Sequence, residues 1–277
     1  AMPSQFGDVQ RIIGGRYALV FQERGIQRLS YVGPPSVWRA DEVSGDRGTI
    51  APHSVVNIGY QTFFLAQDGF YVTNGSAFQQ IGSQRVNDWF FETAAGPKLR
   101  NVHAAVDWVN GAIVWAFQSA QADSTDRLII YSWEQQRWST TTVNVDWLVG
   151  SAIDGIDLDS LDAIYSDLDS VPVSLDSVLF QSGERVLGGF VNGASTSEYA
   201  LFNGDPMQAT WETGEFQPSP GQRVFVNGIY PLMEADSWDM QAAVVTKDNF
   251  GMENASPEVA GGWGGFCPVR GKWHKTR

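Results

Sequence analysis

The chain has 277 residues, of which 43% are hydrophobic and 13% aromatic, a length and composition that exclude an intrinsically disordered protein and suit one large all-β core or two ordinary ones. Its formal net charge of −13 argues against a protein that wraps nucleic acid, because phosphate binding requires a surface rich in Lys and Arg. No run of 18 apolar residues occurs, so no membrane-spanning segment is expected.

Strand-like runs alternate with turn signals through the first half of the chain. RYALVFQERGIQRLSYVG predicts a hairpin from Tyr17 to Val32 that turns at Arg24-Gly25. In the next unit, Asp68-Gly69 and Asn74-Gly75 supply the positive φ angles that tight turns between strands require. The strands expected on either side of the first of these turns are Thr62–Ala66 and Phe70–Thr73.

One stretch favours a helix. SQRVNDWFFETA, from Ser83 to Ala94, begins with a serine able to cap, and it spaces Val86, Phe90 and Phe91 for a single apolar face. We expect a short helix that crosses between two β units.

Three more units follow. The third turns at Asn110-Gly111 and continues as DRLIIYSWEQQRWST, in which we expect Trp138 to pack back onto the preceding strand. The fourth turns at Asn192-Gly193 and Asn203-Gly204 and ends with Trp211. The last unit shows the same alternation of strand-like runs and turn signals.

The units recur at a spacing typical of propeller blades. Leu19, Phe64 and Val114 occupy comparable positions about 45–50 residues apart, a period expected of β-propeller blades with several strands each. The predicted fold is therefore all-β and β-propeller-like, with repeated antiparallel blades; a two-sheet sandwich is the alternative. Four or five blades are few for a closed ring, so we expect a fragment or a ring completed by a neighbouring chain. The expected domains are 1–150, propeller blades; 151–180, an Asp-rich insertion; and 181–277, further blades or a terminal β subdomain.

A search for catalytic chemistry finds little. The three histidines lie in unrelated units without metal-ligand spacing: His53, His103 and His274. Cys267 lacks the context of a nucleophile and cannot form an intrachain disulfide. The polar residues at 22–24 and at Asp46-Arg47 are interpreted as turn-stabilising ion pairs rather than a sugar pocket. We expect a protein without enzymatic activity, cofactor or metal.

The segment LDSLDAIYSDLDSVPVSLDSVLF is the most unusual one. Residues 151–180 contain no basic residue and seven aspartates: Asp154, Asp157, Asp159, Asp162, Asp167, Asp169 and Asp176. An EF-hand loop beginning at Asp157 fails, because Asp162 and Leu168 replace the required glycine and glutamate. Leucines recurring every seven residues suggest an acidic surface segment that is anchored to the rest of the protein by these leucines. We expect this segment to face a channel or a basic partner; a cation site is the alternative.

Four stretches carry a family resemblance: GGRYALVFQERGIQRLSYVGPP, FFLAQDGFYVTNGSAFQQIGSQRVNDWFF, DRLIIYSWEQQRWS and LDSLDAIYSDLDSVPVSLDS. Together they resemble tailed-bacteriophage structural proteins with a β-propeller body, found in the tail or at the head–tail junction. The resemblance implies a virion component, similar to a nozzle or hub, that forms a homo-oligomeric ring with other tail or connector subunits. DNA would pass this ring without specific binding, and no membrane would be involved.

A carbohydrate-binding propeller, as a receptor-binding module or a weak glycosidase, is the alternative function. Tryptophans exposed together on one face would favour it, because sugars stack on such rings. Tryptophans buried inside the blades would favour the scaffold.

Overall fold

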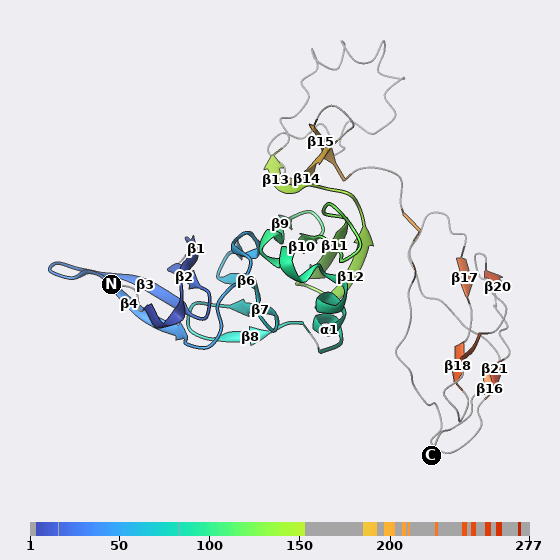
Figure 1. Cartoon of the computed structure of the whole chain (residues 1–277), viewed down its shortest axis with the longest axis horizontal. Coiled ribbons are helices and arrows are strands. Elements are labelled where there is room, and N and C mark those ends of the chain that lie inside the picture. Colours follow the sequence, from blue (N-terminus) through green and yellow to red (C-terminus); the bar gives the residue numbers. More distant parts are fainter. Residues whose placement is uncertain are drawn as a thin grey trace, which may run out of the picture. The chain divides into compact units, whose positions relative to one another are not determined.

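The structure is a computed structural model that describes residues 4–15, 17–82, 84–152, 185–192, 197–202, 207–208 and 210, together with six short strands further on. The chain divides into two compact units, Ala1–Asp205 and Pro206–Arg277, which are described separately (Figure 1).

The first unit contains four antiparallel sheets, each with its strands in chain order. The first sheet consists of β1 (Val9–Ile13), β2 (Ala18–Gln22), β3 (Ile26–Gly33) and β4 (Val37–Ser44). The second consists of β5 (Val56–Ile58), β6 (Gln61–Ala66), β7 (Gly69–Thr73) and β8 (Phe78–Gln80). The third consists of β9 (His103–Asp107), β10 (Ala112–Phe117), β11 (Arg127–Ser132) and β12 (Arg137–Thr142). The fourth consists of β13 (Trp147–Ala152), β14 (Arg185–Asn192) and β15 (Ser197–Leu201).

Helical segments connect these sheets. The helix α1 (Gln84–Thr93) links the second sheet to the third, and 3-10 turns precede three of the sheets: η1 (Ser4–Phe6), η2 (Pro52–Ser54) and η3 (Gly96–Asn101). Phe90 of α1 is buried in the core, and Val86 and Phe91 pack against it, so the helix and its apolar face predicted from the sequence are confirmed. Among the described residues, no helix has the length and apolar character to cross a membrane.

The sequence repeat corresponds to a structural one. Leu19, Phe64 and Val114 lie on β2, β6 and β10, the second strand of three successive four-stranded sheets. The all-β prediction is therefore confirmed, whereas the part of the chain that is described contains no sheet closed on itself. The hairpin turns also match: Gly69 and Gly111 follow β6 and β9 with φ angles of 144° and 58°.

The sheets pack face to face in chain order. Strand β6 is buried on both faces, because Phe64 and Ala66 contribute to a core with the first sheet, whereas Phe63 and Leu65 contribute to a core with the third sheet and α1. The central strand β10 repeats this arrangement, with Val114 on the side of the fourth sheet. Burial on both faces explains why these strands are continuous apolar runs instead of alternating ones.

Aromatic rings fill the core between the second and third sheets. Trp115 is fully buried, and its ring lies 4.9 Å from that of Phe70 and 5.8 Å from that of Trp138. Trp138 comes from the last strand of the sheet and lies 4.7 Å from Tyr131. The expectation that Trp138 packs back onto the preceding strand is confirmed.

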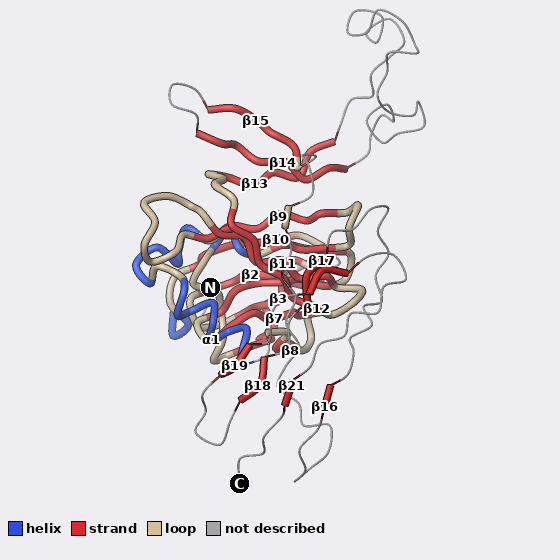
Figure 2. The backbone as a smooth tube through the Cα atoms, turned by 90° about the vertical axis from the view of Figure 1, so that its right-hand side faces the viewer, coloured by secondary structure: helices blue, strands red, loops and turns tan. Residues whose placement is uncertain are grey.

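The fourth sheet is assembled across a long connection. Strand β13 pairs with β14 from Trp147 opposite Phe190 to Ala152 opposite Arg185, so residues 153–184 join two neighbouring strands of one sheet. Figure 2 shows β13 and β14 beside β9, with which both are in contact.

The described residues of the second unit form three short antiparallel ladders, each enclosing the next in sequence order. They pair β16 (Phe225–Val226) with β21 (Gly271–Lys272), β17 (Met240–Ala242) with β20 (Val259–Gly261), and β18 (Val245–Lys247) with β19 (Glu253–Ala255).

Candidate functional site

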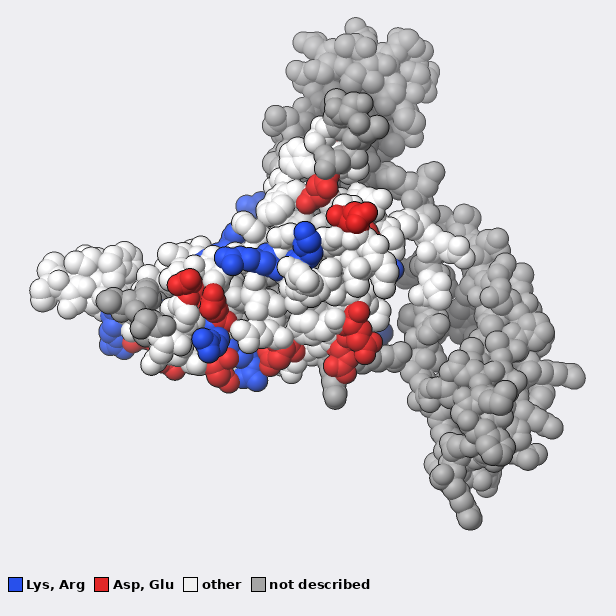
Figure 3. All heavy atoms as spheres, in the orientation of Figure 1, with Lys and Arg blue, Asp and Glu red and all other residues white. Residues whose placement is uncertain are grey.

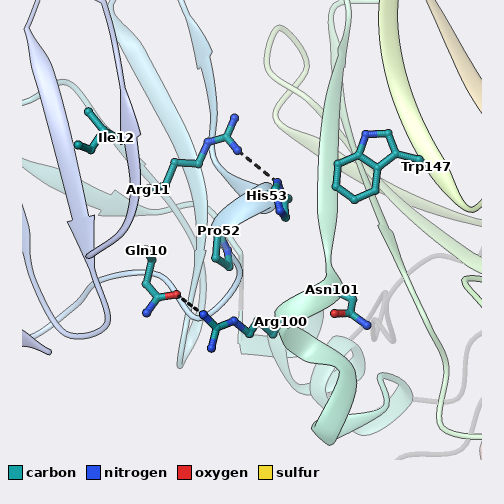
Figure 4. Close-up of a pocket in the computed structure, with 8 residues that line it drawn as sticks. All are labelled: Gln10, Arg11, Ile12, Pro52, His53, Arg100, Asn101 and Trp147. Carbon is teal, nitrogen blue, oxygen red and sulfur yellow. Dashed lines mark hydrogen bonds between the residues drawn. The ribbon is translucent and has the colours of Figure 1, made fainter. Parts of the chain in front are cut away.

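The segments at the start of the four sheets lie next to one another. Strand β1 contacts η2, η2 contacts η3 and β9, and β9 contacts β13. They surround a cleft of about 580 Å³, which we name the first-strand cleft. Its lining residues, drawn in Figure 4, are Gln10, Arg11, Ile12, Pro52, His53, Arg100, Asn101 and Trp147.

The turn η2 holds its part of the cleft rigidly. Pro52 sits in the first turn of η2, where its fixed φ suits a helical start, and it places His53 at the cleft. The next residue, Ser54, is buried: its hydroxyl accepts a hydrogen bond from the Leu65 backbone N–H (3.2 Å), and its carbonyl accepts one from the Trp115 indole (3.0 Å). The position of His53 is thus anchored to the core.

Two arginines bring positive charge to the cleft. Arg11 Nη1 donates to His53 Nδ1 at 3.3 Å, and Arg100 Nη2 donates to Gln10 Oε1 at 3.3 Å (Figure 4). The Gln10 amide in turn donates to Glu23 Oε1 at 3.3 Å, so an amide separates that carboxylate from Arg100. No Asp or Glu is among the eight lining residues of the cleft.

Trp147 forms the aromatic wall. Its indole stacks on His103 with the ring centroids 4.4 Å apart and the planes 10° from parallel, and it meets His53 edge-on at 5.0 Å. His103 is buried and is oriented by a hydrogen bond of 3.1 Å between its Nδ1 and the Asn101 carbonyl. Trp147 itself is 41% exposed, so a well-supported ring presents apolar surface at the cleft.

Both histidines remain neutral near pH 7. Burial lowers the pKa of His103 and outweighs the opposite effect of its hydrogen bond to Asn101. Burial also lowers the pKa of His53, and the charge of Arg11 lowers it further. Since His53 Nδ1 accepts a hydrogen bond from Arg11, the neutral ring carries its proton on Nε2. The positive charge of the cleft therefore comes from the two guanidinium groups.

The histidines lie in different units, as expected, in η2 and at the start of β9. The structure nevertheless brings both rings against the same indole, a proximity that the sequence spacing did not predict. The reason is the packing of the sheets, which places the beginning of each repeat beside the next. Among the residues that the structure describes, no group of three or more His, Cys, Asp or Glu could hold a metal ion.

The other candidate residues have different outcomes. Cys267 and His274 lie outside the described residues. The same holds for the seven aspartates of the Asp-rich insertion: Asp154, Asp157, Asp159, Asp162, Asp167, Asp169 and Asp176. The ion-pair interpretation of Asp46-Arg47 is confirmed, since Arg47 Nη1 lies 2.7 Å from Asp46 and Arg47 Nε lies 3.0 Å from Asp68.

Sequence reasoning missed the cleft, although a signal for it exists. Arg11, His53, Arg100 and Trp147 follow one another at intervals of 42, 47 and 47 residues, close to the spacing of the sequence repeats. They differ in residue type, so a comparison of apolar positions between repeats does not detect them. Reading the equivalent position at the start of each repeat would have grouped them.

The positions of the tryptophans bear on the choice between a structural scaffold and a carbohydrate-binding protein. Trp115 is fully buried, and Trp89, Trp133 and Trp138 pack against the same core. The exposed tryptophans of the described residues belong to three different sheets or their turns: Trp38, Trp108 and Trp147. This distribution favours a scaffold over a single sugar-binding face.

Comparison with known proteins assigns no family. No protein-family model matches this sequence, and no match is found among curated proteins. Any function therefore rests on the structure and on the resemblance carried by the sequence.

Proposed function

We propose that this chain is a non-enzymatic structural protein of a tailed-phage virion, located in the tail or at the head–tail junction. Its sheets act as propeller blades, and several subunits form a ring around the DNA path. The observation that carries the proposal is the face-to-face packing of four antiparallel sheets in chain order, with their entering segments in contact. Blades around an axis pack in this way, because each sheet buries one face on each neighbour.

The hairpin of β3 and β4 supplies a surface for assembly. It extends away from the sheets in Figure 1, and its end carries no charged side chain, as the white projection in Figure 3 shows. Tyr31 and Trp38 pack edge to face at 5.6 Å, yet they remain 67% and 57% exposed. Val32 and Val37 are exposed beside them. Contiguous apolar surface of this kind marks protein–protein contacts, and here it supports docking to a neighbouring subunit.

The fourth sheet supports the same proposal. Leu187 packs toward the third sheet, and the next residues on the opposite face include Phe190, which lies 5.6 Å from Tyr199. Both rings are exposed, although the equivalent faces of the preceding sheets are covered by another sheet. A further blade, from the same chain or from a neighbour, would bury these rings as the other sheets are buried.

The acidic segment completes the proposal. Its aspartates, at 154–176, lie in a chain with 31 acidic and 18 basic residues. Carboxylates repel phosphate, so a ring with this segment at its lumen lets duplex DNA slide instead of binding it.

Assembly through the hairpin is the first test. We expect the wild-type chain to form oligomers in sedimentation velocity, with ring-shaped particles in negative-stain electron microscopy. The double variant Tyr31→Ser/Trp38→Ser should remain monomeric and keep its circular dichroism spectrum. Tyr60→Ser is the matched control, because Tyr60 is an exposed aromatic residue in the turn between β5 and β6. A wild-type chain that stays monomeric at high concentration, or a double variant that assembles normally, would contradict the proposal.

A further inference from the structure

The first-strand cleft has a charge that is unusual for this chain. Most of the arginines whose side-chain contacts are described lie beside a carboxylate, in the pairs Arg28–Asp41, Arg39–Asp41, Arg47–Asp46, Arg47–Asp68 and Arg127–Asp126. By contrast, Arg11 and Arg100 each make one hydrogen bond within the described residues, to a neutral group. A guanidinium group has five N–H donors, so both retain donors for a ligand. In a protein with a net charge of −13, a cleft with two such groups attracts anions.

The aromatic wall of the cleft, formed by Trp147, sets a second requirement for a ligand. His53 lies between Arg11 and Trp147 and contacts both, so a guanidinium group and an exposed indole are separated by one imidazole ring (Figure 4). The stacked His103 supports the indole from within, because it is buried and bonded to the backbone. A ligand that satisfies both features needs an oxyanion for Arg11 and an apolar ring face for Trp147.

We propose that the first-strand cleft binds a sugar-sized ring that carries one oxyanion group, either a carboxylate or a phosphate. Arg11, which lies beside His53, binds the oxyanion through charge-assisted hydrogen bonds, and the C–H face of the ring packs on Trp147. Arg100 adds positive charge elsewhere on the cleft wall. The Asn101 amide, which also lines the cleft, is placed to bind ring hydroxyl groups. The cleft volume of about 580 Å³ accommodates one or two such rings. This inference is independent of the structural role proposed above, because a virion scaffold can also carry a binding site.

Nuclear magnetic resonance of the full chain tests the proposal. The indole N–H signal of Trp147 is assigned from its loss in Trp147→Phe, and it is then followed during titration with glucuronate, glucose 6-phosphate and glucose. We expect a shift with at least one of the acidic sugars at about millimolar concentration and none with neutral glucose. A response to glucuronate alone identifies the carboxylate source, and a response to glucose 6-phosphate alone identifies the phosphate source.

Variants separate the role of charge from that of folding. Arg11→Gln should weaken binding by about tenfold or more, the effect of losing a charge-assisted hydrogen bond. Arg100→Gln should weaken binding less, because it removes only positive charge from the cleft wall. Arg137→Gln is the matched control, because Arg137 is an exposed arginine on β12 and does not line the cleft. Unchanged melting temperatures would show that all three variants fold.

Three results would overturn the proposal. The first is the absence of any Trp147 shift with either acidic sugar, and the second is an equal shift with glucose. The third is wild-type affinity in Arg11→Gln. None of these results affects the proposed structural role, which the assembly of the chain tests separately.

Discussion

Trp115 connects the second and third sheets with the turn η2. Its ring packs on Phe70 from the second sheet and on Trp138 from the third, and its indole N–H donates to the Ser54 carbonyl beside the cleft. We expect Trp115→Ala to lower the free energy of unfolding by about 3–5 kcal/mol, because the cavity and the lost hydrogen bond add. Urea denaturation of the purified variants measures this change. In contrast, Trp38→Ala should cost less than about 1 kcal/mol, since that ring is exposed. Equal losses in the two variants would show that the core is not organised as described.

His103 makes stability depend on pH. Its pKa is lowered in the folded protein by burial, from an ordinary value of 6.5. The unfolded chain therefore binds the proton more readily, and the stabilising contribution, complete above about pH 6.5, is lost as the pH falls through the folded pKa. His53, whose pKa is lowered by burial and by Arg11, acts in the same direction, whereas the nearby Asp146 favours the charged form of His103.

Urea denaturation at about pH 7.5 and about pH 5.5 measures this dependence. We expect the free energy of unfolding to be smaller at the lower pH. His103→Asn should show a weaker pH dependence, because Asn can still donate to the Asn101 carbonyl but does not titrate. The same pH dependence in wild type and variant would exclude His103 as its source.

At the scale of elements, Asn87 holds the helix to the second sheet. Its buried side-chain amide donates to the carbonyls of Asp68 (3.4 Å) and Gly82 (3.3 Å), and its Oδ1 accepts from the Phe70 N–H (3.4 Å). Gly69 has a φ of 144° and lies so close to Asn87 that a side chain there would clash.

We expect Asn87→Ala to lower the free energy of unfolding by about 2–3 kcal/mol, because three backbone groups lose their partner and two of these hydrogen bonds are buried. Asp88→Ala is the control, since Asp88 is the exposed neighbour in the same helix, and it should change stability by less than about 0.5 kcal/mol. Thermal and urea denaturation compare the two variants. A neutral effect of Asn87→Ala would mean that water replaces these bonds.

Local sequence signals predicted the strands and turns well, whereas the pairing of strands that are distant in the sequence was harder to predict. Asp68-Gly69 and Asn110-Gly111 located hairpin turns correctly, because a positive φ is required within a few residues. The same reasoning placed the fourth unit entirely after the Asp-rich segment. Its first strand, β13, instead precedes residues 153–184, and its partner β14 follows them. Such a pairing is determined by the apolar surface that the third sheet offers, which no local pattern encodes.

The cleft was predictable only in part, for the same reason. His53 and His103 were recognised as a residue in a turn and a residue at the start of a strand, and both positions are confirmed. Their approach to Trp147 depends on how whole sheets stack, so spacing rules for local motifs could not detect it. The spacing of the sequence repeats is the signal that connects them.

At the largest scale that the structure describes, the first unit combines covered inner sheets with exposed aromatic rings at two places. The inner sheets are covered on both faces, whereas the β3–β4 hairpin and the outer face of the fourth sheet leave aromatic rings in solvent. On the face drawn in Figure 3, acidic and basic side chains are interspersed over the described part of the first unit. This division between a covered interior and apolar ends suits a subunit that is completed by neighbours.

Immunogold electron microscopy, with antibody raised against this chain and applied to the tailed-phage particles that the proposal implies, tests the central claim most directly. The proposed function predicts gold at the tail, either near the vertex or at the tip, and loss of label after the antibody is adsorbed with the purified chain. Particles that remain without label, even after mild disruption exposes internal tail surfaces, would contradict a structural role in the virion.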